Sequence, residues 1–176
     1  MKMIAIAVVT EAGLLIARRA STWTVDERLG GRSPECVAVD LRRPAQVYCG
    51  TARTGLLRSR DSGRGRCRGP ADPDTVIVSA TDGPGTAYWP RSAKAYVYRK
   101  RGLKRWEQAM SGLPEAKGTT ASRFATHAGE PGVIYAANNR GLFRSDDAGR
   151  SWKALDLPWP EPGLADGVEA LAYLPE

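Results

Sequence analysis

The feature that most constrains this chain is an internal repeat. Residues 44–64, PAQVYCGTARTGLLRSRDSGR, align with residues 131–150, PGVIYAANNRGLFRSDDAGR, at an offset of 86 or 87 residues. Weaker copies occur at half this spacing, since the GLL of residues 13–15 lies 42 residues before the GLL of residues 55–57. Self-similarity at a fixed period of about 43 residues is typical of proteins built from one copied structural unit. The chain therefore contains four copies, not two.

Each copy consists of short β-branched and aromatic segments separated by turn residues, which is the pattern of short strands. The four strand types are MIAIAVV, QVYCGT, TVIVSAT and VIYAAN; GLLIARR, GLLRSR, AYVYRKR and GLFRSD; STWTVDE, RWEQAM and SWKALD; and CVAVDLRRP, RFATHAGEP and VEALAYLPE. Four antiparallel strands repeated every 40-odd residues are the pattern of a propeller blade. We therefore predict one all-β, β-propeller-like domain over residues 1–176, with about four degenerate four-stranded units at approximately 1–34, 35–70, 71–120 and 121–176.

The copies are unequal. Only nine residues separate Gly63 from Pro73, whereas 24 separate Trp106 from Pro131, so the second unit lacks its last strand and the third lacks its first. The third unit also contains an insertion, DGPGTAYWPRSAK, at residues 82–94. We expect the first and last strands of the chain to pair and so to close the ring, because open sheet edges promote aggregation. In an alternative arrangement, a second chain completes the ring as a symmetric dimer.

Composition and charge restrict the function classes. A hydrophobic fraction of 42% and a charged fraction of 26% are ordinary for a folded domain. The net charge of +7 is spread along the chain, which favours a solvated basic surface over a dedicated anion site and disfavours a nucleic-acid partner. Three cysteines without a CxxC spacing and the single His127 favour reduced thiols in the cytoplasm, with no metal and no cofactor. Glu11 interrupts the N-terminal apolar run, so no signal peptide or membrane insertion is expected.

The stretch Ser145-x-Asp147-x-Gly149-x-Ser151-Trp152 matches the Asp-box pattern. The chain thereby resembles the Asp-box (BNR) repeat β-propellers, a group that includes sialidases, sortilin-type receptor domains and photosystem II assembly factors. The second copy retains the box positions Ser59, Asp61 and Gly63 but lacks the later hydroxyl and tryptophan.

Turn chemistry explains this spacing without catalysis. We expect Asp147 to accept hydrogen bonds from its own turn, and Gly149 to adopt a positive φ. Trp152 should be buried, with its indole N–H bonded to an acceptor. The resemblance implies that these boxes lie away from the central cleft and serve folding, so the expected role of Asp147 is structural.

The resemblance also makes glycoside hydrolysis a hypothesis, because sialidases use an arginine triad, a Tyr nucleophile assisted by Glu, and an Asp acid/base. The Arg-Ile-Pro signature typical of that group is missing here. The candidate nucleophiles are Tyr88, Tyr96 and Tyr98, which are better explained as strand or loop residues. No motif places a glutamate opposite any of them; the glutamates considered are Glu107, Glu115 and Glu130.

We therefore favour a non-catalytic binding or scaffold module, with no catalytic residue assigned, over a sialidase-like exo-glycoside hydrolase that acts on an anionic sugar. Within the insertion, Tyr88, Trp89 and Arg91 supply the aromatic and cationic contacts that recognise carbohydrate or protein partners. The basic runs at residues 58–68 and 99–105 could meet on adjacent units and hold an anion. A solvated edge that guards against sheet pairing is the favoured interpretation of these runs.

Overall fold

The computed structural model of the chain describes residues 4–31, 33–39, 47–51, 55–59, 75–81, 87–126, 130–160, 164 and 167–174. These residues form four small antiparallel sheets, and no helix occurs among them. The prediction of an all-β chain is therefore confirmed. A supply of 19 Gly and 12 Pro suits this architecture, because many short strands need many tight turns.

The first sheet joins the two ends of the sequence. It consists of β14 (Ala170–Leu174), β1 (Ile4–Val9), β2 (Leu14–Arg19) and β3 (Trp23–Arg28), in that order. β1 pairs antiparallel with β14 over five residue pairs, from Ala5↔Leu174 to Val9↔Ala170. The expected pairing of the first and last strands is thus confirmed.

The other three sheets are meanders of consecutive strands. The second contains β4 (Pro34–Val39), β5 (Val47–Thr51) and β6 (Gly55–Ser59); the third contains β7 (Thr75–Thr81), β8 (Ala95–Arg101) and β9 (Glu107–Gln108); the fourth contains β10 (Arg123–Thr126), β11 (Ile134–Asn138), β12 (Gly141–Ser145) and β13 (Lys153–Leu155). In the described part of the chain, the second and third sheets have three strands where the first and fourth have four. The repeat spacing predicts shortened units at these two places.

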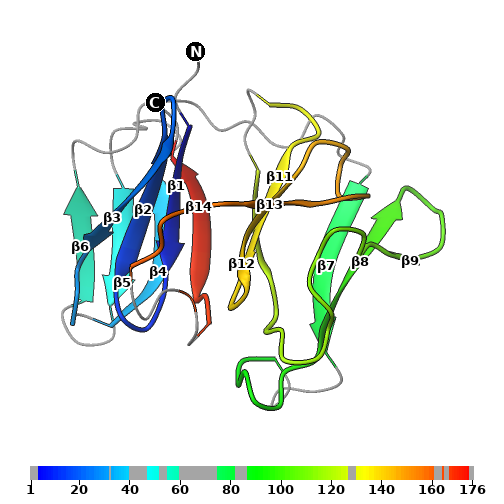
Figure 1. Ribbon diagram of the computed structural model, residues 1–176, viewed down its shortest axis with the longest axis horizontal. Coiled ribbons are helices and arrows are strands. Elements are labelled where there is room, and N and C mark those ends of the chain that lie inside the picture. The colour runs from blue at the N-terminus through cyan, green and yellow to red at the C-terminus, as the bar shows by residue number, and fades with distance from the viewer. Residues whose placement is uncertain are drawn as a thin grey trace.

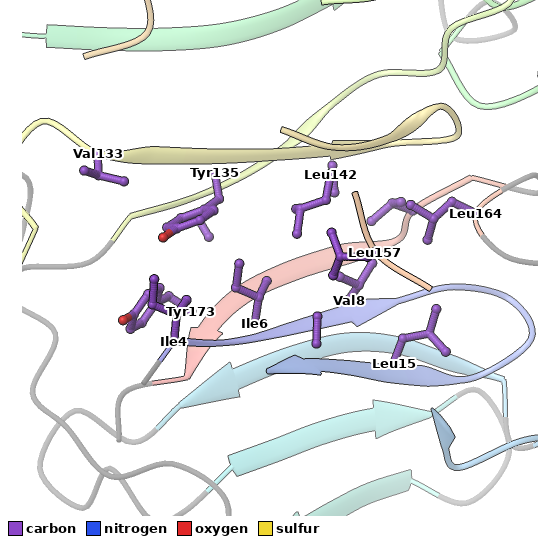
Figure 2. Packing of buried hydrophobic residues seen from close by; sticks show 14 residues of the cluster. Ile4, Ile6, Val8, Leu15, Val133, Tyr135, Leu142, Leu157, Leu164 and Tyr173 are labelled. Carbon is purple, nitrogen blue, oxygen red and sulfur yellow. The ribbon is translucent and has the colours of Figure 1, made fainter. Parts of the chain in front are cut away.

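Strand alternation lets the first sheet pack on both of its faces. The side chains of Ile4, Ile6 and Val8 belong to the core shared with the fourth sheet, where they lie opposite Tyr135 and Leu142 (Figure 2). The intervening residues of β1 belong to a second core, which also includes a contact with Val37 of β4. Because both faces of β1 are covered, all six of its residues are buried.

A third core joins the fourth sheet to the third. It contains Val97 and Ala109 from the third sheet's side, and Ile134, Phe143 and Trp152 from the fourth sheet's side. The sheets are therefore stacked in the order second, first, fourth, third. Figure 1 shows the two three-stranded sheets at opposite ends of this stack, so the pairing of β1 with β14 does not close it into a ring. No strand pairing joins the second sheet to the third among the described residues.

The two edges of the stack carry different connections. The turn between β1 and β2, the segment 87–93 that precedes β8 and the segment that leads into β14 lie at the lower edge in Figure 1, which we call the loop face. The turn between β12 and β13 lies at the opposite edge. Trp152, at the end of this turn, and Tyr88, in the segment before β8, therefore lie on opposite edges of the molecule.

Candidate functional site

The turn at 145–151 is closed by the carboxylate of Asp147. One carboxylate oxygen, Oδ1, accepts hydrogen bonds from the backbone N–H groups of Arg150 and Ser151, both at 2.9 Å, and from the hydroxyl of Ser145 at 2.8 Å. The other oxygen accepts the hydroxyl of Ser151 at 2.6 Å. All the hydrogen bonds described for this carboxylate come from groups of its own turn.

These hydrogen bonds set the charge state of Asp147. Burial alone would raise the pKa of Asp147, but hydrogen bonds from the side chain and backbone of Ser151, the side chain of Ser145 and the backbone of Arg150 outweigh it and lower the pKa to about 2. The group is therefore ionised at neutral pH. A carboxylate with a lowered pKa is a poor general acid, because it holds no proton to give.

The same turn also joins the fourth sheet to the third. Trp152 is 4% exposed, and its indole N–H donates to the carbonyl of Ala109 at 3.1 Å. Arg99 of β8, 3% exposed, donates to the carbonyl of Ala148 at 2.8 Å and pairs with Glu107 at 2.6 Å. Gly149 has a φ of 82°, and a Cβ at this position would collide with Ile77 of β7. The contacts of the turn are thus with its own backbone and with the neighbouring sheet.

The second copy of the pattern lies mostly beyond what the structure describes. Ser59 is the last residue of β6, and Asp61 and Gly63 lie outside the described residues. His127 and most of the basic run at 58–68 lie there as well. The basic run at 99–105 is divided by strand alternation, because Arg99 faces the fourth sheet and is buried while Lys100 faces away.

The insertion places its aromatic residues on the loop face. Tyr88 is 50% exposed and Trp89 is 69% exposed, and Arg91 beside them is also exposed. The insertion is anchored to the fourth sheet by the N–H of Ala121, which donates to the carbonyl of Ala87 at 2.8 Å. The structure thus brings the three predicted ligand contacts together on one anchored and accessible segment.

A cavity of about 470 Å³ opens on the same face, lined by Glu11, Ser33, Pro34, Glu35 and Glu169. Arg123 links this cavity to the insertion. Its guanidinium lies 5.4 Å from the ring centroid of Tyr88, donates to the carbonyl of Val168 at 3.1 Å and approaches the carboxylate of Glu169 at 3.8 Å. Sequence reasoning missed this site, because its residues are distant in sequence and share no motif.

The only pairing of a tyrosine hydroxyl with a glutamate found among the described residues lies at the opposite edge. Tyr135 donates to Glu130 at 3.2 Å and accepts from Arg144 at 3.1 Å, and Arg144 lies 3.7 Å from Glu130. No sequence motif indicated this pairing of Glu130 with a tyrosine, because the residues involved belong to two strands and the connection before them. Tyr135 is 0% exposed, and burial, followed by the charge of Glu130, raises its pKa. A substrate cannot reach this hydroxyl, and its ionisation is opposed.

The other candidate nucleophiles lack a glutamate partner of this kind in the described residues. Tyr96 and Tyr98 lie on the face of β8 that points away from the fourth sheet, with ring centroids 6.3 Å apart. Glu107 is held by Arg99, and Glu115 is exposed. No group of three or more His, Cys, Asp or Glu side chains suited to a metal ion occurs in the part of the chain that is described. There too, no helix has the length and hydropathy required to span a membrane.

Comparison with solved structures gives distant likenesses at the level of the fold. An ancestral GH74 enzyme of known crystal structure aligns with 89% of this chain at 13% sequence identity and a TM-score of 0.39. The chain spans only 24% of that enzyme's length. No protein-family model matches the sequence, and no curated protein matches it.

Proposed function

We propose that this chain is a non-catalytic, β-propeller-like binding module of the Asp-box type, and that it binds a neutral carbohydrate on the loop face. The observation that carries the proposal is the exposure of Tyr88 and Trp89 beside a cavity of about 470 Å³. Adjacent exposed aromatic side chains mark an interaction site more often than a single exposed aromatic residue does. Their flat faces suit the C–H faces of a sugar ring.

The chemistry of the cavity favours neutral over anionic sugars. Three of the five lining residues that the structure describes are glutamates, Glu11, Glu35 and Glu169, whose carboxylates can accept hydrogen bonds from sugar hydroxyls. An anionic sugar would meet the like charges of Glu11 and Glu35 there, which disfavours it, whereas Arg123 is paired with Glu169. Support for the sialidase-like alternative is correspondingly weak, because the described Tyr–Glu pair is buried.

The Asp147 turn has a structural role in this proposal. Its contacts with Ala109, Arg99 and Ile77 join two sheets at the edge opposite the loop face. A rigid stack holds the ligand-binding segment in one orientation, so that little ordering entropy is lost on binding.

The test is a titration of the protein with neutral and sialylated oligosaccharides, followed by calorimetry. We expect saturable binding of a neutral oligosaccharide that Trp89→Ala weakens at least about tenfold, the scale of an interfacial aromatic hot spot. Trp106→Ala is the matched control, because Trp106 is also exposed, at 49%, but lies beside β9 in the third sheet. Equal binding by the Trp89 variant and wild type, or retention of sialylated sugars alone, would overturn the proposal.

Turnover is measured in parallel with a fluorogenic sialoside. The binding proposal predicts no release of the fluorophore above the rate of a blank. Release that disappears on replacing one tyrosine would establish the hydrolase instead.

A further inference from the structure

The edge of β7 that faces away from β8, which we call its inner edge, differs from the corresponding edges of the other sheets. In those sheets, the strand equivalent to β7 has a neighbour on each side: β1 lies between β14 and β2, β5 between β4 and β6, and β11 between β10 and β12. Among the described residues, β7 pairs with β8 alone. The third sheet is thus an incomplete version of a unit whose complete form occurs in the same chain.

The sequence of this edge lacks the usual protection. Isolated proteins protect edge strands with charged residues, prolines or β-bulges. The central residues of β7, Val76–Ala80, include none of these residue types, and the seven residue pairs between β7 and β8 run without a register shift. Val76 is also 48% exposed. A straight, uncharged edge of this kind is a template for pairing with another strand.

We propose that the inner edge of β7 binds an extended peptide segment of a partner protein, which pairs antiparallel with Val76–Ala80 as a fourth strand of the third sheet. The site is separate from the loop-face site and does not depend on the proposed carbohydrate ligand. An added strand would take the place in the third sheet that β10 and β14 take in theirs.

The two faces of the third sheet define the side chains of the partner. On the face toward the fourth sheet, a δ carbon of Ile77 lies against Gly149, and the hydroxyl of Ser79 accepts from the N–H of Ser122 at 3.0 Å. Peptide residues on this side should be small or apolar, because they enter a packed interface.

On the other face, Val76 and Val78 lie beside Lys100 and Tyr98 of β8. Lys100 of β8 lies on that face, with its ammonium 5.9 Å from the ring centroid of Trp106. Peptide residues on this side should be acidic, because the charge they approach is positive. The partner segment therefore alternates apolar and acidic residues.

A synthetic nine-residue peptide of alternating valine and glutamate is a suitable probe, because it is extended and has the predicted pattern of apolar and acidic residues. The fluorescein-labelled peptide is titrated with the full-length protein, and its anisotropy is recorded. The control is the same peptide N-methylated at alternate backbone amides, which removes donors from the ladder but leaves the side chains unchanged. We expect saturable binding of the first peptide and loss of binding of the second, with slower hydrogen exchange at those amides of Val76–Ala80 that point away from β8.

Two variants of β7 test the edge and its charge preference. Val76→Asp is expected to weaken binding about three- to fivefold through like-charge repulsion, whereas Val76→Lys should leave it unchanged or tighter. Both melting midpoints should stay near that of wild type, because the side chain is half-exposed. Trp89→Ala should leave peptide binding unchanged.

Equal binding of the N-methylated peptide would overturn the proposal, and so would no saturation up to about 1 mM protein, the limit of measurable weak affinity. A dimer in light scattering that Val76→Asp converts to monomer would show that the edge binds a second copy of this chain, which also overturns a peptide partner.

Discussion

Replacing Asp147 with Ala should destabilise the protein without changing its fold. The substitution removes the acceptor of two backbone N–H groups and two hydroxyls. A pKa unit corresponds to about 1.4 kcal/mol. Lowering the pKa of Asp147 from 3.8 to about 2 is therefore worth at most about 2.5 kcal/mol to the folded state. Solvent at this surface turn screens part of that energy, so we expect a loss of about 1–2 kcal/mol.

The magnitude translates into a thermal shift. For a chain of this size, each kcal/mol moves the melting midpoint by about 2–4 °C. The Asp147→Ala variant should therefore melt about 2–8 °C below wild type at neutral pH in differential scanning calorimetry. Asp146→Ala is the matched control, because Asp146 is the neighbouring carboxylate and the described contact of its side chain is an exposed pair with Arg144 at 2.8 Å. An exposed pair of this kind contributes about 0–1 kcal/mol.

The pH dependence gives a second test of the same carboxylate. Because the pKa of Asp147 is lower in the folded chain than in the unfolded chain, its contribution is fully present above the unfolded value, near 3.8, and disappears as pH falls through about 2. Wild type should lose this contribution over that interval, and Asp147→Ala should lack it. Equal melting midpoints of wild type and Asp147→Ala at neutral pH would refute the proposed role of the turn.

Two further variants test other parts of the stack. Tyr135→Phe removes a buried hydroxyl that is bonded to Glu130 and Arg144, so it should lower the free energy of unfolding in urea by about 1–2 kcal/mol. Tyr98→Phe, on an outer face, should lower it by less than about 0.5 kcal/mol. Similar losses in the two variants would contradict the buried network. Cys36 is exposed and Cys49 is buried. In a Cys67→Ser variant, Cys36 should react with a thiol reagent at least about tenfold faster than Cys49, because burial, followed by the charge of Cys36, raises the pKa of Cys49. Equal rates in the native state, before denaturant is added, would contradict the described packing of β5.

Local chemistry made some features predictable from sequence. The partners of Asp147 lie within four residues of it, so the spacing of one turn determines all four hydrogen bonds. The pairing of β1 with β14 followed from the repeat, because the first unit lacks a strand that the end of the chain can supply. Strand type and order in a repeated unit depend mainly on short-range patterns, which a single sequence contains.

Contacts between distant segments were not predictable in this way. Glu11, Glu35 and Glu169 line one cavity only because three connections meet on the loop face. The Tyr135–Glu130–Arg144 network likewise depends on the approach of β11, β12 and the connection before β11. The closure of a ring was expected from the repeat. Ring closure depends on whether the sheets at the two ends of the stack pair with each other, and no local sequence pattern encodes that long-range contact.

The pairing of Ala5 with Leu174 has a consequence for folding during synthesis on the ribosome. β1 leaves the exit tunnel before the other thirteen described strands, and its partner β14 is the last of them to be synthesised. At about 5–20 residues per second, the nascent β1 waits on the order of ten seconds for that partner. During this delay the apolar edge of β1 can pair with non-native strands. A chaperone that shields β1 during synthesis should therefore raise the yield of native protein more than one that acts after release.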